Sequence, residues 1–317
     1  MIEIVFSFLL TLSGLFVLLN TRLKYLAVDK PNERSLHSSF IPRTGGLAIM
    51  SGVLVTWLFI GVSFEWLLLP AALIAISLID DIRGLKARWR FLAQIIVCAL
   101  FLALHPQNIA LWAMPLVLLA MVWMVNLYNF MDGSDGLAGG MALFGFGAYA
   151  MAAYLAASPE LAMLCASIAG ANLAFLIFNF HPARIFMGDA GSIPLGFLAA
   201  AIGLYGWQQA LWQFWFPILV FSPFIADASI TLLKRLLRRE KIWQAHKSHY
   251  YQRLVQMGWG HRKTALMEYG VMLAAGVSGI LAFTYGGWLI VAVIALWCLI
   301  YLVLMMMIDK LWACRQQ

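Results

Sequence analysis

Six aspartates lie in four short stretches of a chain in which only 11% of the residues are charged. The stretches hold Asp80 and Asp81, Asp132 and Asp135, Asp189, and Asp227. Glycines flank the second and third stretches, and a glycine lets backbone N–H groups approach an anion closely. Carboxylates are ligands that Mg²⁺ prefers, with water and substrate phosphates in its other positions. Carboxylates, glycines and nearby cations are the groups that phosphoryl transfer uses.

Each acidic stretch also has a structural explanation. Asp227 follows Pro223 inside an apolar run, where a helix–helix hydrogen bond explains a buried acid equally well. Asp80 and Asp81 end an apolar run, where water at the membrane surface can solvate them. Ionisable groups at membrane depth are costly and usually line a polar cavity. Four such stretches at one membrane face therefore favour a shared active site over four separate structural roles.

The composition allows one class of protein. The chain has 317 residues, of which 63% are hydrophobic and 11% are charged, with a mean hydropathy of +0.87. A soluble domain carries roughly 25% charged residues, so this chain cannot coat a soluble globule. The cysteines form no C-x-x-C pair, which argues against a zinc or disulfide framework. We expect an all-α, polytopic membrane protein.

Apolar runs long enough to cross a bilayer recur along the whole chain. A spanning helix needs about 20 apolar residues. On that basis the sequence predicts eleven spans, with ten as the alternative count. They are residues 2–20, 44–62, 64–79, 91–106, 109–128, 137–157, 160–180, 192–207, 211–233, 264–284 and 287–308. The first run lacks a basic start and a small-residue cleavage site, so we expect a retained span and not a signal peptide.

Lysine and arginine fall on one side of these spans. They lie in residues 22–43, 83–90 and 234–263, at Arg184, and after the last span. Cytoplasmic loops are enriched in Lys and Arg, so the N-terminus is expected outside and the C-terminus in the cytoplasm. The aspartates lie on the same side, although acids contribute little to orientation. We therefore expect one membrane domain, residues 1–317, whose active site faces the cytoplasm through loops near 21–43, 80–90, 129–136, 181–191 and 234–263.

The last long loop combines a basic helix end with two histidines. Residues 234–239 continue a span as a basic run, and His246, His249 and Arg253 follow. One explanation is an anchor that touches anionic lipid at the cytoplasmic surface. The other is a clamp for the anionic part of a substrate.

The motif N-x-x-N-x-x-D-G-x-D-G-L, from Asn126 to Leu137, resembles one of the polyprenyl-phosphate N-acetylhexosamine-1-phosphate transferases, glycosyltransferase family 4. Other segments match this family in the same order. They are Asp29 to His37, Pro42 to Gly46, Asp80-Asp81, Asn179 to Ser192, and Pro223 to Asp227. The family's phospho-MurNAc-pentapeptide transferase carries adjacent histidines in the late loop, and this chain does not. It looks more like the branch that starts O-antigen or other surface glycans, some members of which use 6-deoxy sugars.

The resemblance implies a magnesium-dependent enzyme of the bacterial inner membrane, with Mn²⁺ as the alternative metal. A UDP-N-acetylhexosamine, or its 6-deoxy form, would meet polyprenyl (undecaprenyl) phosphate at the cytoplasmic face. The lipid phosphate would attack the β-phosphate, UMP would leave, and a polyprenyl diphosphate sugar would remain. The lipid bilayer is the expected environment, and no nucleic acid is expected as a partner.

The resemblance also implies roles for particular residues. Asp189 and Asp132 would hold the metal. Asp80 and Asp81 would position the lipid phosphate or a metal, or act as base. The other assignments are Asp135, Asn179 and Phe186 for uridine, His246, His249 and Arg253 for the diphosphate, Asn129 for substrate contact, and Arg43 and His37 for the lipid phosphate.

Two other functions fit parts of the pattern. Intramembrane acids often mark the ion pathway of a transporter, but here they lie at one membrane edge and the sequence shows no convincing internal repeat. A scaffold that recruits glycan enzymes would not need these acids.

Outward helix faces rich in Trp and Phe fit lipid contact, and a homodimer seam is the alternative.

Overall fold

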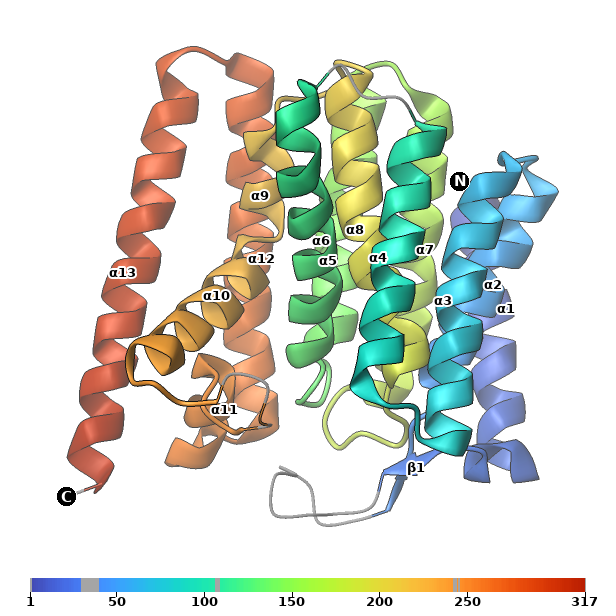
Figure 1. Ribbon diagram of the computed structural model, residues 1–317, viewed down its shortest axis with the longest axis horizontal. Helices are drawn as coiled ribbons and strands as arrows, with labels where there is room; N and C mark the ends of the chain where they lie inside the picture. The colour runs from blue at the N-terminus through green and yellow to red at the C-terminus, as the bar shows by residue number, and fades with distance from the viewer. Residues whose placement is uncertain (1, 30–39, 106–108, 242–243, 245, 317) are drawn as a thin grey trace.

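Helices make up nearly all of the computed structural model, which describes residues 2–29, 40–105, 109–241, 244 and 246–316 (Figure 1). The helices are α1 (Ile2–Asn20), α2 (Gly45–Phe59), α3 (Phe64–Arg83), α4 (Ala87–Leu104), α5 (Met114–Phe130), α6 (Leu137–Leu155), α7 (Pro159–Asn179), α8 (Asp189–Gln208), α9 (Trp215–Val220), α10 (Ser222–Leu237), α11 (Tyr250–Leu254), α12 (Gly260–Tyr285) and α13 (Trp288–Gln316). Two 3-10 turns, η1 (Arg22–Tyr25) and η2 (Leu111–Ala113), and one π-helical turn, η3 (Val255–Trp259), join them.

Eight helices in the described part of the chain are long and apolar enough to cross a membrane, which confirms the expected all-α membrane fold. α2 is apolar but has only 15 residues. α3 has 20 residues, but its last turn carries Asp80, Asp81 and Arg83. Both helices coincide with predicted spans, and the count of eleven stays a prediction.

The predicted span 211–233 is not one helix. It divides into α9 and α10 at Phe221, whose ψ of 9° departs from helical geometry. Pro217 and Pro223 lie in the first turns of the two pieces, where a missing N–H removes no helical hydrogen bond. α10 runs obliquely toward α13 (Figure 1). The run therefore holds two helices, because two prolines favour two helix starts, and its crossing of the membrane stays a prediction.

The loops that carry the predicted site lie at one end of the bundle. Figure 1 places β1, α11 and the C-terminus at this end, where α3 meets α4, α5 meets α6, and α7 meets α8. β1 (Val28–Asp29) pairs with β2 (Ile41–Pro42) in an antiparallel ladder. The alternating direction of consecutive helices thus brings acidic stretches from distant parts of the sequence to the same end.

α8 lies in the interior of the bundle, and α13 lies at its edge. In α8, 78% of the spanning window is buried within the protein, against 11% in α13. Polar side chains also join the helices: Trp57 Nε1 donates to Ser167 Oγ at 2.8 Å, and Ser7 Oγ donates to the Ser167 carbonyl at 2.9 Å. Because α8 begins at Asp189, this interior helix sets the position of the predicted metal ligand.

Candidate active site

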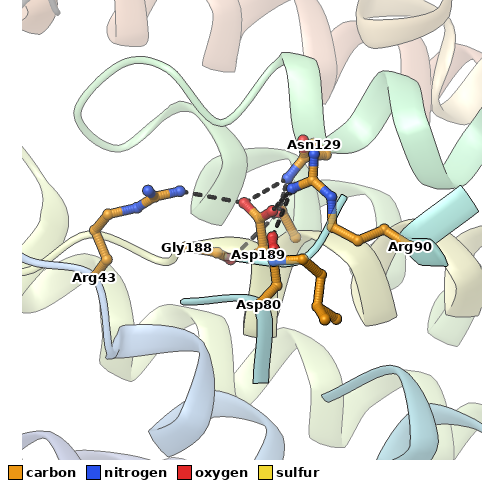
Figure 2. Close-up of polar contacts among 8 residues, drawn as sticks. Arg43, Asp80, Arg90, Asn129, Gly188 and Asp189 are labelled. Atoms are coloured by element: carbon orange, nitrogen blue, oxygen red, sulfur yellow. Dashed lines mark hydrogen bonds and ion pairs between the residues drawn. The ribbon is translucent and has the colours of Figure 1, made fainter. Parts of the chain in front are cut away.

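Asp189 lies at the centre of a cluster of charged and amide side chains (Figure 2). Arg43 comes two residues before α2, Arg90 lies in the first turn of α4, and Asn129 lies in the last turn of α5. Figure 2 shows these three side chains converging on the Asp189 carboxylate from different directions. Four segments that are distant in the sequence therefore meet at one point.

Both carboxylate oxygens of Asp189 accept hydrogen bonds. Arg43 Nη2 lies 3.2 Å and Asn129 Nδ2 lies 3.0 Å from Oδ1, and Arg90 Nη1 lies 3.1 Å from Oδ2. The Asp189 side chain is 12% exposed, whereas the side chains of Arg43 and Arg90 are 35% and 36% exposed. The acid is thus buried beneath two cations that stay accessible to an anion from solution.

Arg90 also connects Asp189 with the predicted acidic pair. Its Nη1 atom lies 2.8 Å from Asp80 Oδ2. The other oxygen of Asp80 accepts the backbone N–H of Leu85 at 2.6 Å, across the turn that joins α3 to α4. From the sequence alone, Arg90 counted only among the cations that set membrane orientation. One signal in the sequence could have identified Arg90 as a site residue: it lies ten residues after Asp80, at the start of an apolar run.

Backbone pairing brings Arg43 to this cluster. The Phe186 N–H donates to the Pro42 carbonyl at 2.7 Å, and the Gly45 N–H donates to the Phe186 carbonyl at 2.9 Å. The segments before α2 and before α8 therefore run side by side. The Phe186 side chain is half-buried, and its contact with uridine stays a prediction.

Gly188 allows these two segments to approach each other. Its φ is 71°, and a Cβ at this position would lie 2.5 Å from the Arg43 carbonyl oxygen. Only glycine combines a positive φ with so close a contact. The glycine before Asp189 is therefore needed to place Arg43 and Asp189 together. His37, the other predicted residue of the first loop, lies outside the described residues.

Asn129 joins the end of α5 to the start of α8. Its Nδ2 group donates to Ser192 Oγ at 2.9 Å as well as to Asp189. The Ser192 hydroxyl donates to the Gly188 carbonyl at 3.3 Å. Ser192 is fully buried and holds the first turn of α8, a role that its place in the sequence motif did not reveal.

Asp81 and Asp132 lie beside this cluster. Asp81 follows the predicted span 64–79 and is half-buried. Burial is the largest cause that raises the pKa of Asp81 to about 6, and the negative charges of Asp189 and Asp80 act in the same direction. Asp132 is also half-buried, and its N–H donates to the Asn129 carbonyl at 3.2 Å. The structure therefore brings acids from three of the four stretches to one region.

These carboxylates fit a magnesium site with few protein ligands. Mg²⁺ is usually held by one or two carboxylates and takes its other ligands from water and phosphates. Asp81 and Asp189 are close enough for one charge to raise the pKa of the other group, and a cation between them would relieve that repulsion. Within the residues that the structure describes, no three His, Cys, Asp or Glu side chains form a metal-binding group. Water and substrate phosphates are the usual remaining ligands of such an ion.

Two residues predicted to hold uridine are bonded within the protein. Asp135 is 5% exposed, and it accepts a hydrogen bond from His181 Nδ1 at 2.6 Å and one from a backbone N–H at 3.1 Å. The side chain of Asn179 makes two hydrogen bonds of 2.9 Å, one to the backbone of each neighbouring loop. Its Oδ1 accepts the Gly136 N–H, and its Nδ2 donates to the Ile185 carbonyl. These side chains hold two loops together, and their contact with uridine stays a prediction.

Asp227 caps the start of α11. Its carboxylate accepts the backbone N–H groups of Tyr250 and Tyr251 at 2.9 Å each, and the Thr231 hydroxyl at 3.1 Å. An acid at a helix N-terminus stabilises that end. The structural explanation for Asp227 is therefore the better one, although the bond is a helix cap and not a helix–helix bond.

The two histidines of the late loop pack near the end of α5. The ring of His249 lies 6.3 Å from that of Phe130, and its Nδ1 lies 3.2 Å from Asp227 Oδ1. His246 Nδ1 accepts the Ser248 N–H at 3.3 Å. Burial lowers the pKa of His246 to about 4, and the neighbouring His249 contributes. His246 is therefore neutral at pH 7 when no anion is bound beside it, and its contact with a diphosphate stays a prediction.

Arg253 is bonded to α13. Its Nη1 lies 2.7 Å from Asp309 Oδ1, and its guanidinium lies 5.0 Å from the centroid of the Tyr250 ring. Lys234 pairs with the same acid. With a side chain only 6% exposed, Arg253 anchors α11 to α13, and its contact with the diphosphate stays a prediction. Asp309 was missed because an acid at the end of a long apolar run is typical of a solvated helix end.

The described segment from α3 to α8 matches a known family. The sequence profile of the family described as glycosyl transferase family 4 covers residues 63–206. This range contains Asp80, Arg90, Asn129 and Asp189, so all the members of the central cluster except Arg43 lie within the match.

Curated relatives are similar over most of the chain. A Bacillus subtilis (strain 168) protein named "Probable undecaprenyl-phosphate N-acetylglucosaminyl 1-phosphate transferase" is 30% identical over 313 residues, covering 91% of this chain and 87% of that protein. The phospho-N-acetylmuramoyl-pentapeptide-transferase of Geobacillus kaustophilus (strain HTA426) is 30% identical over 311 residues, with coverage of 86% and 94%. The decaprenyl-phosphate N-acetylglucosaminephosphotransferase of Mycobacterium leprae (strain TN) is also 30% identical, with coverage of 81% and 76%.

Proposed function

The chain belongs to glycosyl transferase family 4, and on that premise we propose that it transfers a sugar 1-phosphate from a UDP-sugar to polyprenyl phosphate and releases UMP. The observation that carries the proposal is the cluster in which Arg43 and Arg90 lie over the buried Asp189. Accessible cations above a buried acid suit a diphosphate that binds together with a divalent cation. The names of the relatives support transfer of a sugar 1-phosphate to a polyprenyl phosphate.

An apolar groove along α5 suits the prenyl chain of the acceptor. The groove has a volume of about 400 Å³ and lies between α5, α8, α9 and α10. Its lining extends along α5 from Val117 to Leu127 and includes Ile225 of α10. Leu127 lies two residues before Asn129, which bonds Asp189. A prenyl chain in this groove would therefore bring its phosphate to the cluster from within the membrane.

The transfer exchanges one phosphorus–oxygen bond for another. An oxygen of the lipid phosphate forms a bond to the β-phosphorus, and the bond from that phosphorus to the UMP oxygen breaks. A phosphate monoester has a second pKa of about 6, so the lipid phosphate is largely ionised at neutral pH and needs no obligatory base. Arg43 and Arg90 would stabilise the negative charge that spreads over the transferred phosphate. Asp80 would keep the Arg90 guanidinium in place.

Asp189 would hold Mg²⁺, with Asp132 as the second ligand and Mn²⁺ as the alternative metal. The bound ion would neutralise charge on the phosphate oxygens as a Lewis acid. Asp81 lies close enough for the charge of Asp189 to raise its pKa, which supports a role for Asp81 in orienting either the ion or the lipid phosphate.

Removal of divalent cations is expected to abolish UMP release. The described protein ligands are too few to hold the ion tightly without phosphates, so EDTA should act within one assay and added Mg²⁺ should restore the rate. Binding of Mn²⁺, followed by electron paramagnetic resonance, should tighten when the UDP-sugar is present. Full turnover in excess EDTA would contradict the metal assignment.

We place the protein in the bacterial inner membrane, with its site facing the cytoplasm and a surface glycan such as O-antigen as the final product. The one-sided distribution of Lys and Arg supports the orientation. The late loop, with only His246 and His249 in place of adjacent histidines, supports the surface-glycan branch. Relatives of both branches are 30% identical, so overall identity does not select the sugar.

The reaction is tested with the purified full chain in detergent, Mg²⁺, undecaprenyl phosphate and a panel of donors. The panel contains UDP-N-acetylhexosamines, their 6-deoxy forms and UDP-MurNAc-pentapeptide, and UMP is the measured product. We expect UMP release that requires the lipid phosphate and an N-acetylhexosamine-type donor. Turnover of UDP-MurNAc-pentapeptide alone would contradict the surface-glycan branch, and no UMP with any donor would contradict the reaction.

A further inference from the structure

A buried acid between two histidines lies outside the charged cluster. Asp135 precedes α6, His181 lies in the loop between α7 and α8, and His261 lies in the first turn of α12. The two imidazole rings are nearly parallel, with centroids 5.5 Å apart and an angle of 15° between their planes. The transfer step proposed above uses neither histidine.

The hydrogen bonds around Asp135 show whether Nδ1 of each imidazole donates or accepts. A carboxylate only accepts, so His181 donates through Nδ1 at 2.6 Å. The N–H of Asp135 donates to His261 Nδ1 at 3.4 Å, so that nitrogen is an acceptor and takes the Ser134 hydroxyl at 2.8 Å. His181 is thus the imidazole that donates to the carboxylate. His261 supports the backbone beside it.

These contacts fasten two loops to each other. Asp135 also accepts the Ala183 N–H at 3.1 Å, so His181 and its loop hold the carboxylate at two points. Asn179 accepts the Gly136 N–H and donates to the Ile185 carbonyl, which spans the same pair of loops.

Both fastened loops lead directly into the charged cluster. The loop before α6 begins after Phe130, one residue past Asn129, and contains Asp132, and the loop before α8 leads into Asp189. Asn129 and Asp189 are joined by one hydrogen bond of 3.0 Å. A shift of either loop would change this bond and the spacing between the two proposed metal ligands. A misplacement of about 1 Å at a reacting centre can cost roughly 100-fold in rate.

We propose that His181 is a positioning residue for the transfer reaction, which acts through Asp135 to hold the α5–α6 loop against the α7–α8 loop. The expected effect on the transfer rate rests on the proposed function. The expected effect on how firmly the two loops are held rests on the hydrogen-bond geometry alone. His181 is 40% exposed, so a substitution there creates no large cavity and leaves the helix bundle intact.

Three substitutions separate this role from others. His181→Ala removes the donor, His181→Asn keeps an N–H close to the position of Nδ1, and His181→Gln moves the donor one carbon further out. We expect Ala and Gln to lower kcat about 10- to 100-fold and Asn to stay within about threefold of wild type. The KM for polyprenyl phosphate should not change, because no residue that lines the groove lies in either loop. Arg184→Ala, an exposed neighbour whose side chain lies over Phe178, is the matched control and should behave as wild type.

Amide hydrogen exchange gives a second readout that needs no turnover. Residues 131–136 and 181–185 should exchange faster in His181→Ala than in wild type, and His181→Asn should restore slow exchange. A turnover rate of His181→Ala equal to that of the wild-type protein would overturn the proposal. Loss of activity in His181→Asn equal to that in His181→Ala would also overturn it, because the imidazole would then act by another route. An inactive wild-type protein with the expected exchange pattern would instead count against the proposed function alone.

Discussion

Replacing Asp189 by asparagine is expected to lower the rate of UMP release about 100- to 1,000-fold, the range typical of losing one preorganised electrostatic group. The substitution keeps the size of the side chain but removes the charge that Arg43 and Arg90 share. It also places an NH₂ group opposite a donor, either Asn129 Nδ2 or Arg90 Nη1. The proposed metal would lose its principal carboxylate as well. Steady-state UMP release with saturating lipid phosphate measures the effect.

Glu240→Gln is the matched control for this experiment. Glu240 pairs with Arg235 at 3.4 Å and is 40% exposed, outside the central cluster. It should retain wild-type turnover. Because the two arginines next to Asp189 are about one-third exposed, water can solvate them in the variant, and the thermal melting curve should stay close to that of wild type. An Asp189→Asn protein that melts normally and turns over at the wild-type rate would remove Asp189 from the reaction.

Replacing Arg90 by methionine is expected to lower the same rate at least about 100-fold. Arg90 bridges Asp80 and Asp189, so its loss leaves two acids facing each other without their shared cation. It also removes one of the two accessible cations that would contact the diphosphate. Arg90→Lys should recover little of the rate, because a single ammonium does not reproduce the planar fork of a guanidinium.

Arg88→Met controls for the loss of one positive charge near the membrane surface. Arg88 lies two residues earlier on α4, where its guanidinium is 5.3 Å from the centroid of the Trp89 ring. We expect it to turn over normally. If Arg90→Met and Arg88→Met lowered the rate equally, the effect of Arg90 would be one of surface charge, and its bridging role would be contradicted.

The helices that were predicted correctly from the sequence are those that are determined by neighbouring residues along the chain. Whether a run is apolar and long enough to span a membrane depends only on adjacent residues, so the predicted run 2–20 and α1 agree. The run 160–180 and α7 agree to within one residue at each end for the same reason. The break in the run 211–233 was not predicted, because it depends on where two prolines fall in relation to a turn, which hydropathy does not register.

The acids of the site were predicted better than their partners. Motif spacing pointed to Asp80, Asp81, Asp132 and Asp189, and the structure gathers these at one end of the bundle. Arg90 and Arg253 are both arginines in basic loops, yet one bridges two acids of the cluster and the other bonds Asp309 on α13. Nothing local distinguishes them, because the partner of each is supplied by a different helix.

By itself, the sequence determined that this is an all-α membrane protein of glycosyl transferase family 4, and it predicted which acids and glycines the chemistry would use. The length of an apolar run, the positions of charges and the spacing of a motif depend only on the order of residues along the chain. They can therefore be identified without coordinates. Only the tertiary structure decided that Arg90 meets Asp189 across 99 positions and that His181 fastens Asp135. Such pairs depend on how helices are rotated and how loops pair at the end of the bundle, and these come from packing across the whole fold.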